Sequence, residues 1–360
     1  MVPDIHPEDI DAVAMVLRSG MLVQGEKVAE FETNVSKYIG TKNAIAVSNG
    51  TSSLYLALIA LGIGQGDEVI VPAFSFMATA NAVELTGAKP VFVDISAETF
   101  NIDINLIEKA ITRKTRAIMP VHEFGLACDI NEIISIAEKH HLKVIEDAAC
   151  ALGAAENSQY TGTFGDIGSF SFHPRKAITS GEGGMLTTND DRIAFKLRAL
   201  RNHGIEINDG KSEFALAGYN FRMTDFQAAL LLSQFARLNE IIDYKDKLAQ
   251  VYFTELQDCN KLILPHVPQN KRHSWQSFHV VLHDDIDRDR LIIQLKGKGI
   301  GTNLGAQCMP FQKFFREKYK LNCSKLFPNA MKAYFKGLVL PLYGLLDENN
   351  IRYICNTIKD

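Results

Sequence analysis

Residues 43–72 read NAIAVSNGTSSLYLALIALGIGQGDEVIVP and contain a complete strand–helix–strand unit. The apolar run at residues 44–48 predicts a strand, residues 51–61 predict a helix that ends at Gly62, and residues 68–72 predict a second strand. Both strands are continuous apolar runs, which is typical of parallel strands buried on both faces. This stretch therefore predicts an α/β fold.

The same alternation of strands and helices continues along the chain. Further strands are predicted at residues 90–94, 117–121, 142–146, 167–172, 184–188, 277–282 and 301–303. Helices are predicted at residues 77–85, 104–110, 130–140, 192–201, 224–257 and 287–298. We expect a large domain with a mostly parallel sheet at residues 1–262 and a smaller C-terminal α/β domain at residues 263–360.

Composition excludes several classes of protein. The chain has 360 residues, of which 46% are hydrophobic and 22% charged, so it is neither disordered nor fibrous. Its net charge of -4 argues against a nucleic-acid partner. The uncharged residues 43–66 are interrupted by polar side chains, and the apolar run at residues 54–63 is too short to span a bilayer. We expect no nucleic-acid partner and no membrane segment.

The six cysteines form no C-x-x-C pair, and no histidine lies at zinc-finger spacing from them. In a chain of this size, such spacing indicates neither a disulfide framework nor a metal site, and it favours a reducing compartment. The N-terminal residues are acidic where a secretory signal would be basic and then apolar. We therefore expect a cytoplasmic protein without a bound metal.

Residues 48–53, with the sequence SNGTSS, join a predicted strand to a predicted helix. Gly50 permits close backbone approach, and the hydroxyls of Thr51 and Ser52 accompany the free N–H groups of the first helical turn. Such a helix start can bind a phosphate. The alternative is plain capping of the helix by Asn49, Thr51 or Ser52.

Two charged residues follow predicted strands. Asp147 ends an apolar run, and ligands bind at this edge of an open parallel sheet, where a pyridinium nitrogen would suit the carboxylate. The alternative is a helix cap or a loop acid. Lys176 lies between a Phe-rich strand and the glycine-rich residues 181–184, so a partly buried amine could form a Schiff base, unless Lys176 is an ordinary surface lysine. Ser171 and His173 are in phase along the chain, so the Ser171 hydroxyl could reach the same ligand.

The remaining candidates carry weaker local signals. Phe76 could stack on a flat ring or pack in the core. Asn220 and Arg222 precede a helix whose Thr224 and Gln227 fit a capping box, so both could be turn or surface residues. His203 could face the dipole at a helix C-terminus.

Together these residues carry a recognisable pattern. From Ile10 to the C-terminus, the chain resembles the DegT-type sugar-nucleotide aminotransferases, which are fold-type I enzymes dependent on pyridoxal phosphate (PLP). The segments that carry the resemblance are residues 48–52, 72–81, 146–149, 169–184, 201–204 and 218–225. Each is weak alone, and their joint order and spacing make the likeness strong.

The resemblance implies roles for individual residues. Lys176 matches the catalytic lysine that binds PLP as a Schiff base and moves a proton between substrate and cofactor. Asp147 matches the partner of the pyridine nitrogen. Phe76 matches the aromatic residue that stacks on the ring, and Cys150 stands where the family often has a glutamine near the ring hydroxyl.

The phosphate site and the substrate site follow from the same resemblance. The residues that match phosphate ligands are Gly50, Thr51, Ser52, Ser171 and, from the neighbouring subunit, Asn220. A site shared in this way implies a homodimer with the site at the interface. Candidate substrate-binding residues are His173, His203 and Arg222.

The implied reaction moves an amino group from glutamate to the keto group of a nucleotide-linked 4-keto-6-deoxy sugar, in amino-sugar biosynthesis for surface polysaccharide. Residues 122–125 and 181–184 look most like perosamine synthases, which use a GDP-sugar. Relatives that remove a hydroxyl carry histidine where this chain has Lys176. Alternatives are other PLP chemistry on this fold, namely a sugar dehydratase or an aminotransferase for a cyclitol or 3-keto sugar, and a non-catalytic regulatory protein.

Overall fold

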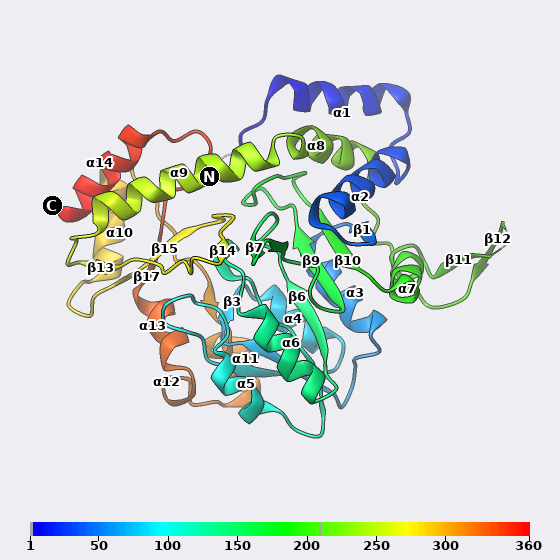
Figure 1. Ribbon diagram of the computed structural model, residues 1–360, viewed down its shortest axis with the longest axis horizontal. Helices are drawn as coiled ribbons and strands as arrows, with labels where there is room; N and C mark the ends of the chain where they lie inside the picture. The colour runs from blue at the N-terminus through cyan, green and yellow to red at the C-terminus, as the bar shows by residue number, and fades with distance from the viewer. Residues whose placement is uncertain (1–2, 209) are drawn as a thin grey trace.

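A seven-stranded sheet forms the centre of the molecule in a computed structural model that describes residues 3–208 and 210–360 (Figure 1). The strand order is β1-β10-β9-β6-β5-β2-β4. Its strands are β1 (Asn43–Val47), β2 (Glu68–Pro72), β4 (Lys89–Val93), β5 (Thr115–Ile118), β6 (Lys143–Asp147), β9 (Ile167–Ser171) and β10 (Gly184–Thr188). Strands β9, β6, β5, β2 and β4 are parallel, and β10 is antiparallel to both of its neighbours. The predicted α/β fold with a mostly parallel sheet is confirmed.

Helices cover both faces of this sheet because successive strand residues point to opposite sides. Val69 and Val71 pack in the core beneath α3 (Gly50–Ala60), α4 (Ala78–Leu85) and α7 (Asp191–Arg201). Ile70, between them, packs on the other side with α5 (Ile104–Ala110) and α6 (Ile130–Lys139). Double coverage explains why the strands read as unbroken apolar runs.

A second sheet of three strands lies toward the C-terminus. It consists of β13 (Leu262–Ile263), β15 (Phe278–Leu282) and β17 (Gly337–Leu340), packed against α9 (Leu238–Leu256), α10 (Arg288–Gly297) and α14 (Glu348–Lys359). Helix α9 begins on the core of the large sheet with Leu238 and ends on the core of the small sheet with Leu256. Phe315 and Phe327, far along the chain, return to the core of the large sheet. A boundary at residue 262 stays a prediction.

Two sequence predictions of secondary structure are wrong. Residues 301–303 form no strand, because Asn303 makes only an isolated bridge to Val339. Residues 224–257 form two helices, α8 (Asp225–Phe235) and α9, because the backbone at Arg237 leaves helical geometry. The remaining elements are α1 (Pro7–Ser19), α2 (Glu26–Ile39), β3 (Phe74–Ser75), β7 (Ala155–Glu156), β8 (Gln159–Tyr160), β11 (Ile205–Asn208), β12 (Lys211–Phe214), β14 (Lys271–Arg272), β16 (Gln307–Cys308), α11 (Lys313–Tyr319), α12 (Cys323–Leu326) and α13 (Pro328–Lys336), with short 3-10 turns at Glu123–Gly125 and Met309–Phe311.

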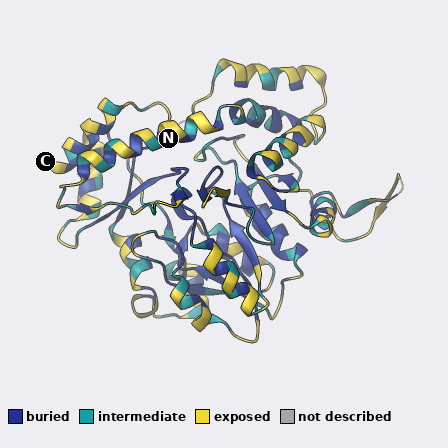
Figure 2. Cartoon of the chain, viewed as in Figure 1, coloured by how far each residue is buried: buried dark blue, intermediate teal, exposed yellow. Residues whose placement is uncertain are grey.

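Two peripheral features expose apolar side chains. The hairpin of β11 and β12 projects away from the rest of the molecule, and helix α1 lies on the outside, as Figure 1 shows. Figure 2 shows that the outer side of α1 is exposed, and its exposed residues include Ile10 and Met15. Ile207 and Phe214 are exposed on the hairpin. Within the described residues, no helix combines the length and the apolar character that crossing a membrane would need.

Candidate active site

The first turn of α3 lies against the carboxyl end of β9. Asn49 caps the helix, because its side chain accepts a hydrogen bond of 2.8 Å from the Ser52 backbone N–H. A Cβ on Gly50 would lie 2.8 Å from the Cβ of Ser171, and one on Gly184 would lie 2.4 Å from the Asn49 carbonyl. Both glycines are therefore required by close approach, which brings the Ser171 hydroxyl next to the helix start; we call Gly50, Thr51, Ser52 and Ser171 together the anion cup.

Asp147 ends β6, the strand next to β9, and its carboxyl group is buried. Oδ2 accepts a hydrogen bond of 2.8 Å from Thr79 Oγ1, and Oδ1 accepts one of 3.2 Å from the Ala149 N–H. Burial raises the pKa of Asp147, and the Thr79 hydrogen bond opposes this shift. Among the described residues, no Lys, Arg or His side chain forms an ion pair with this carboxyl group. It is thus suited to a cationic ring nitrogen.

Lys176 reaches the same region from the loop after β9. The backbone N–H of Lys176 donates to the His173 carbonyl at 2.8 Å and closes a turn. The Nζ atom of Lys176 lies 3.1 Å from Cys150 Sγ. Burial raises the pKa of Cys150, although the Lys176 charge lowers it, so the thiol stays protonated at neutral pH. Within the described chain, the Lys176 amine has no carboxylate partner.

Phe76 and Phe74 alternate across β3 and its exit. Phe74 is fully buried in the core, whereas Phe76 is 70% exposed. The Thr79 N–H donates to the Phe76 carbonyl at 3.2 Å, so Phe76 lies one turn before the residue that bonds Asp147. Phe74 therefore packs in the core, whereas the Phe76 ring is exposed to solvent three residues before Thr79.

Asn220, Arg222 and His203 form a separate group beside the anion cup. The Ser48 N–H donates to the Phe221 carbonyl at 2.8 Å, which fixes this segment next to the end of β1. Arg222 donates to Asn202 Oδ1 at 2.9 Å, and Asn220 and His203 are exposed. Among the described contacts of the chain, none joins these three residues to Lys176. Their proposed roles need a ligand or a second subunit.

Glu123 was not predicted as a site residue from the sequence. Its side chain is buried, and Oε2 has no hydrogen-bond partner among the described residues. Burial and the Asp147 charge raise the pKa of Glu123 to about 8, against an opposing effect of Lys176. A usable signal was present, since an acidic residue soon after an apolar strand also singled out Asp147. Gln276, whose N–H donates to the Phe124 carbonyl (2.9 Å), also has a buried oxygen without a partner in this part of the structure.

Glu146, the residue before Asp147, makes a different kind of contact. Its Oε2 accepts from His122 Nε2 (3.0 Å) and the Gly162 N–H (2.8 Å), and its Oε1 accepts from the backbone N–H groups of Phe164 and Gly165, both at 2.8 Å. The Cys128 N–H donates to His122 Nδ1 at 3.1 Å, so the ring proton lies on Nε2. All acceptor positions of Glu146 are thus used inside the protein.

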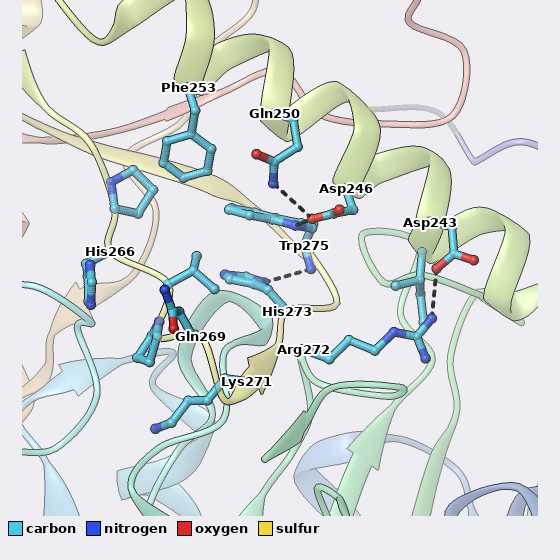
Figure 3. Close-up of a pocket in the computed structure, with 14 residues that line it drawn as sticks. Asp243, Asp246, Gln250, Phe253, His266, Gln269, Lys271, Arg272, His273 and Trp275 are labelled. Atoms are coloured by element: carbon cyan, nitrogen blue, oxygen red, sulfur yellow. Dashed lines mark hydrogen bonds and ion pairs between the residues drawn. The ribbon is translucent and has the colours of Figure 1, made fainter. Parts of the chain in front are cut away.

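A pocket of about 620 Å³ lies between α9 and the segment before β15 (Figure 3). Two pairs of polar groups meet within its lining: Trp275 Nε1 donates to Asp246 at 2.7 Å, and Arg272 contacts Asp243 at 2.9 Å. None of Lys176, Asp147 and Ser171 lines this pocket. The residues at the carboxyl ends of β6 and β9 therefore define the candidate site, and this pocket does not.

The family of DegT/DnrJ/EryC1/StrS aminotransferases matches residues 3–359. The chain belongs to this family. It is 44% identical over 279 residues to a GDP-perosamine synthase of Caulobacter vibrioides, covering 77% of this chain and 75% of that protein. It is 37% identical to the spore coat polysaccharide biosynthesis protein SpsC of Bacillus subtilis, covering 100% of this chain and 95% of that protein.

A solved structure agrees with this membership. Spr1654 from Streptococcus pneumoniae, in its PMP-form, superimposes with a TM-score of 0.94 at 28% identity, covering 99% of this chain and 97% of that chain. The same protein is solved in a PLP-form. This aminotransferase therefore has the fold-type I architecture and depends on PLP, as the sequence resemblance implied.

The residues of the candidate site fit this cofactor. At the anion cup, Gly50 and Gly184 let the start of α3 pack directly against Ser171 and β10, and the N–H groups of that helix start are donors suited to a phosphate. Asp147 is a buried carboxyl group whose hydrogen bonds come only from neutral donors in the described structure. Lys176 offers an amine that no carboxylate neutralises there. An anion site, an acid and an amine at adjacent strand ends match the phosphate, ring nitrogen and aldehyde of PLP.

Proposed function

We propose that this enzyme transfers an amino group from glutamate to the keto group of a nucleotide-linked 4-keto-6-deoxy sugar, in amino-sugar biosynthesis for surface polysaccharide. The observation that carries the proposal is Lys176, whose amine lies at the carboxyl ends of β6 and β9 with the Asp147 carboxyl group. The 44% identity to a GDP-perosamine synthase supports a GDP-linked sugar. Six free cysteines support a cytoplasmic location.

The side chains of the site have separate roles in the proposed reaction. PLP, when bound, supplies an electron sink for the carbon that exchanges its amino group. Lys176 Nζ binds the cofactor and then moves the proton to and from the substrate carbon. Asp147 holds the proton on the ring nitrogen, since a buried carboxylate gains most from a cationic neighbour.

The anion cup and the aromatic residue orient the cofactor. Ser171 and the α3 backbone at Gly50, Thr51 and Ser52 bind the phosphate through N–H and O–H donors. Phe76 covers one face of the ring and excludes water from it. Cys150, a weak hydrogen-bonding group, packs beside Lys176.

We propose that the working unit is a homodimer with the site at its interface, where Asn220 of one subunit reaches the anion cup of the other. Exposed apolar residues on α1 and on the projecting hairpin support an interface there. Phe214→Asp, on the hairpin, should shift sedimentation toward the monomer. Ile293→Asp, at an equally exposed site on α10, is the matched control and should not.

The substrate test uses the enzyme loaded with pyridoxamine phosphate. It is mixed with GDP-, dTDP- and UDP-linked 4-keto-6-deoxy sugars in turn, and the return of PLP absorbance is followed, with product mass as a second readout. We expect return with the GDP-sugar and a product that has gained nitrogen. Return of PLP absorbance with the dTDP- or UDP-linked sugar would change the assigned nucleotide and leave the reaction class unchanged. A product that has lost water would indicate a dehydratase. No return with any sugar contradicts the proposal.

A further inference from the structure

The turn that carries Glu123 is fixed to both segments that flank the cofactor site. The His122 N–H donates to the Asp147 carbonyl at 3.0 Å, so the start of the turn follows the end of β6. At its other end, a Cβ on Gly125 would lie only 3.1 Å from the Cys150 carbonyl oxygen. The turn that carries Glu123 thus lies next to the backbone of Asp147 and of Cys150.

The residue that follows Glu123 has an unusual backbone conformation. Phe124 has a φ of 56°, a left-handed conformation that a bulky residue seldom adopts. Its ring is held by aromatic neighbours, stacked on His279 at a centroid distance of 4.5 Å and edge-on to Phe100 at 5.8 Å. These contacts hold the Phe124 ring, and with it the turn that carries Glu123.

The order of strands in the sheet places Glu123 relative to the ring. Ser171 ends β9, Asp147 ends β6, and Glu123 follows β5, in that spatial order. Glu123 therefore lies on the side of Asp147 that is away from the anion cup. In PLP, the hydroxyl oxygen lies between the ring nitrogen and the aldehyde carbon, on the edge opposite the phosphate arm. A group on that side, within the electrostatic influence of both Asp147 and Lys176, faces the hydroxyl edge.

We propose that Glu123 binds the ring hydroxyl oxygen of PLP by donating a hydrogen bond from a protonated carboxyl group. This inference rests on the proposed placement of the cofactor. Burial keeps the pKa of Glu123 near 8, so the donor proton is present at neutral pH. The Glu123 Oε2 atom has no partner among the described residues, and Cys150 on the same side is a weak donor.

Two variants of Glu123 test whether its side chain acts as a hydrogen-bond donor. Glu123→Gln keeps a neutral N–H donor, and Glu123→Leu removes it. The measurements are the affinity of the apoenzyme for PLP and the pH midpoint of the visible absorbance of the bound cofactor. We expect Glu123→Gln to stay within about twofold of the original chain. Glu123→Leu should lose about tenfold in affinity and move the midpoint up by about one pH unit, because the hydroxyl oxygen loses its donor.

Unfolding of the apoenzyme by urea gives the readout for a purely structural role. Since Glu123→Leu removes a buried carboxyl group with an unpartnered oxygen, its apoenzyme should be at least as stable as the original. Lower stability with an unmoved midpoint would overturn the proposal, and so would a Gln variant that behaves like the Leu variant. If the original chain binds no PLP, the proposed function fails. If it binds PLP and both variants match it, only the role of Glu123 fails.

Discussion

Glu146 and Asp147 are adjacent in β6, and both are buried, yet their surroundings differ completely. Glu146 accepts four hydrogen bonds, three of them from backbone N–H groups, and its position is structural. Asp147 accepts two, both from neutral donors. Adjacent strand residues point to opposite faces, so the Glu146 carboxyl group stabilises the fold and the Asp147 carboxyl group lies at the candidate site. Unused hydrogen-bonding capacity, rather than burial, distinguishes the two.

The largest effect should come from removing the amine of Lys176. Lys176→Ala should lower turnover by about a thousandfold or more, because the proton carrier and the covalent anchor of the cofactor are lost together. The glutamate half-reaction, followed by cofactor absorbance, measures this. Arg175→Ala, an exposed neighbour, is the control. Retained turnover in the Lys176 variant would contradict the mechanism.

Substituting the two adjacent acids tests the comparison directly. Glu146→Ala leaves three backbone donors and the His122 ring unpaired, and should lower the free energy of unfolding by about 3–5 kcal/mol. Asp147→Asn should change the unfolding of the apoenzyme by about 1 kcal/mol or less and lower turnover by about a hundredfold. Urea unfolding and steady-state rates measure the pair. Similar losses of stability in both variants would contradict the difference proposed between a structural Glu146 and a site residue Asp147.

The anion cup provides a smaller test. Gly50→Ala forces a methyl group to within 2.8 Å of Ser171, which should displace the donors of the anion cup and cost about 1–3 kcal/mol in PLP binding. Gly301→Ala is a suitable control, because a Cβ there meets no atom within 4 Å. Apoenzyme titration with PLP measures the affinity. Equal affinity in the two variants would show that the cup does not hold the phosphate.

The smallest effect, counted per pH unit, should appear in the pH dependence of apoenzyme stability. Glu123 has a pKa of about 8 in the fold against an ordinary 4.5, so between these values the native state holds a proton that the unfolded state has lost. The contribution of Glu123 to stability therefore falls as pH rises, by up to about 1.4 kcal/mol per pH unit. The groups facing it are Asp147, Lys176 and Cys150. Glu123→Gln should flatten this dependence in urea unfolding between about pH 6 and pH 8, and an unchanged slope would refute the assignment.

Local patterns in the sequence predicted much of this molecule. The bounds of β2, β10 and α5 match the predicted ranges, because strand runs and helix ends are set by neighbouring residues. Strand-end positions also singled out Asp147 and Ser171. Glu123 also follows a predicted strand, but its position beside Asp147 was not predicted, because that position depends on β5 lying beside β6 and on the left-handed turn at Phe124. Those features come from packing between distant segments, which local spacing does not encode.

The stacking of His279 on Phe124 has a consequence for the evolution of the enzyme. His279 belongs to β15 in the small sheet, and both of its ring nitrogens lack hydrogen-bond partners in the described part of the chain. Burial lowers the pKa of His279 to about 3, so it is a neutral ring serving as a spacer under the turn of Glu123. A change of ring size at this one position would move the turn that carries Glu123 without altering Glu123 itself. If Glu123 binds the cofactor as proposed, substitutions in β15 are a route by which selection can alter the site while every site residue stays the same.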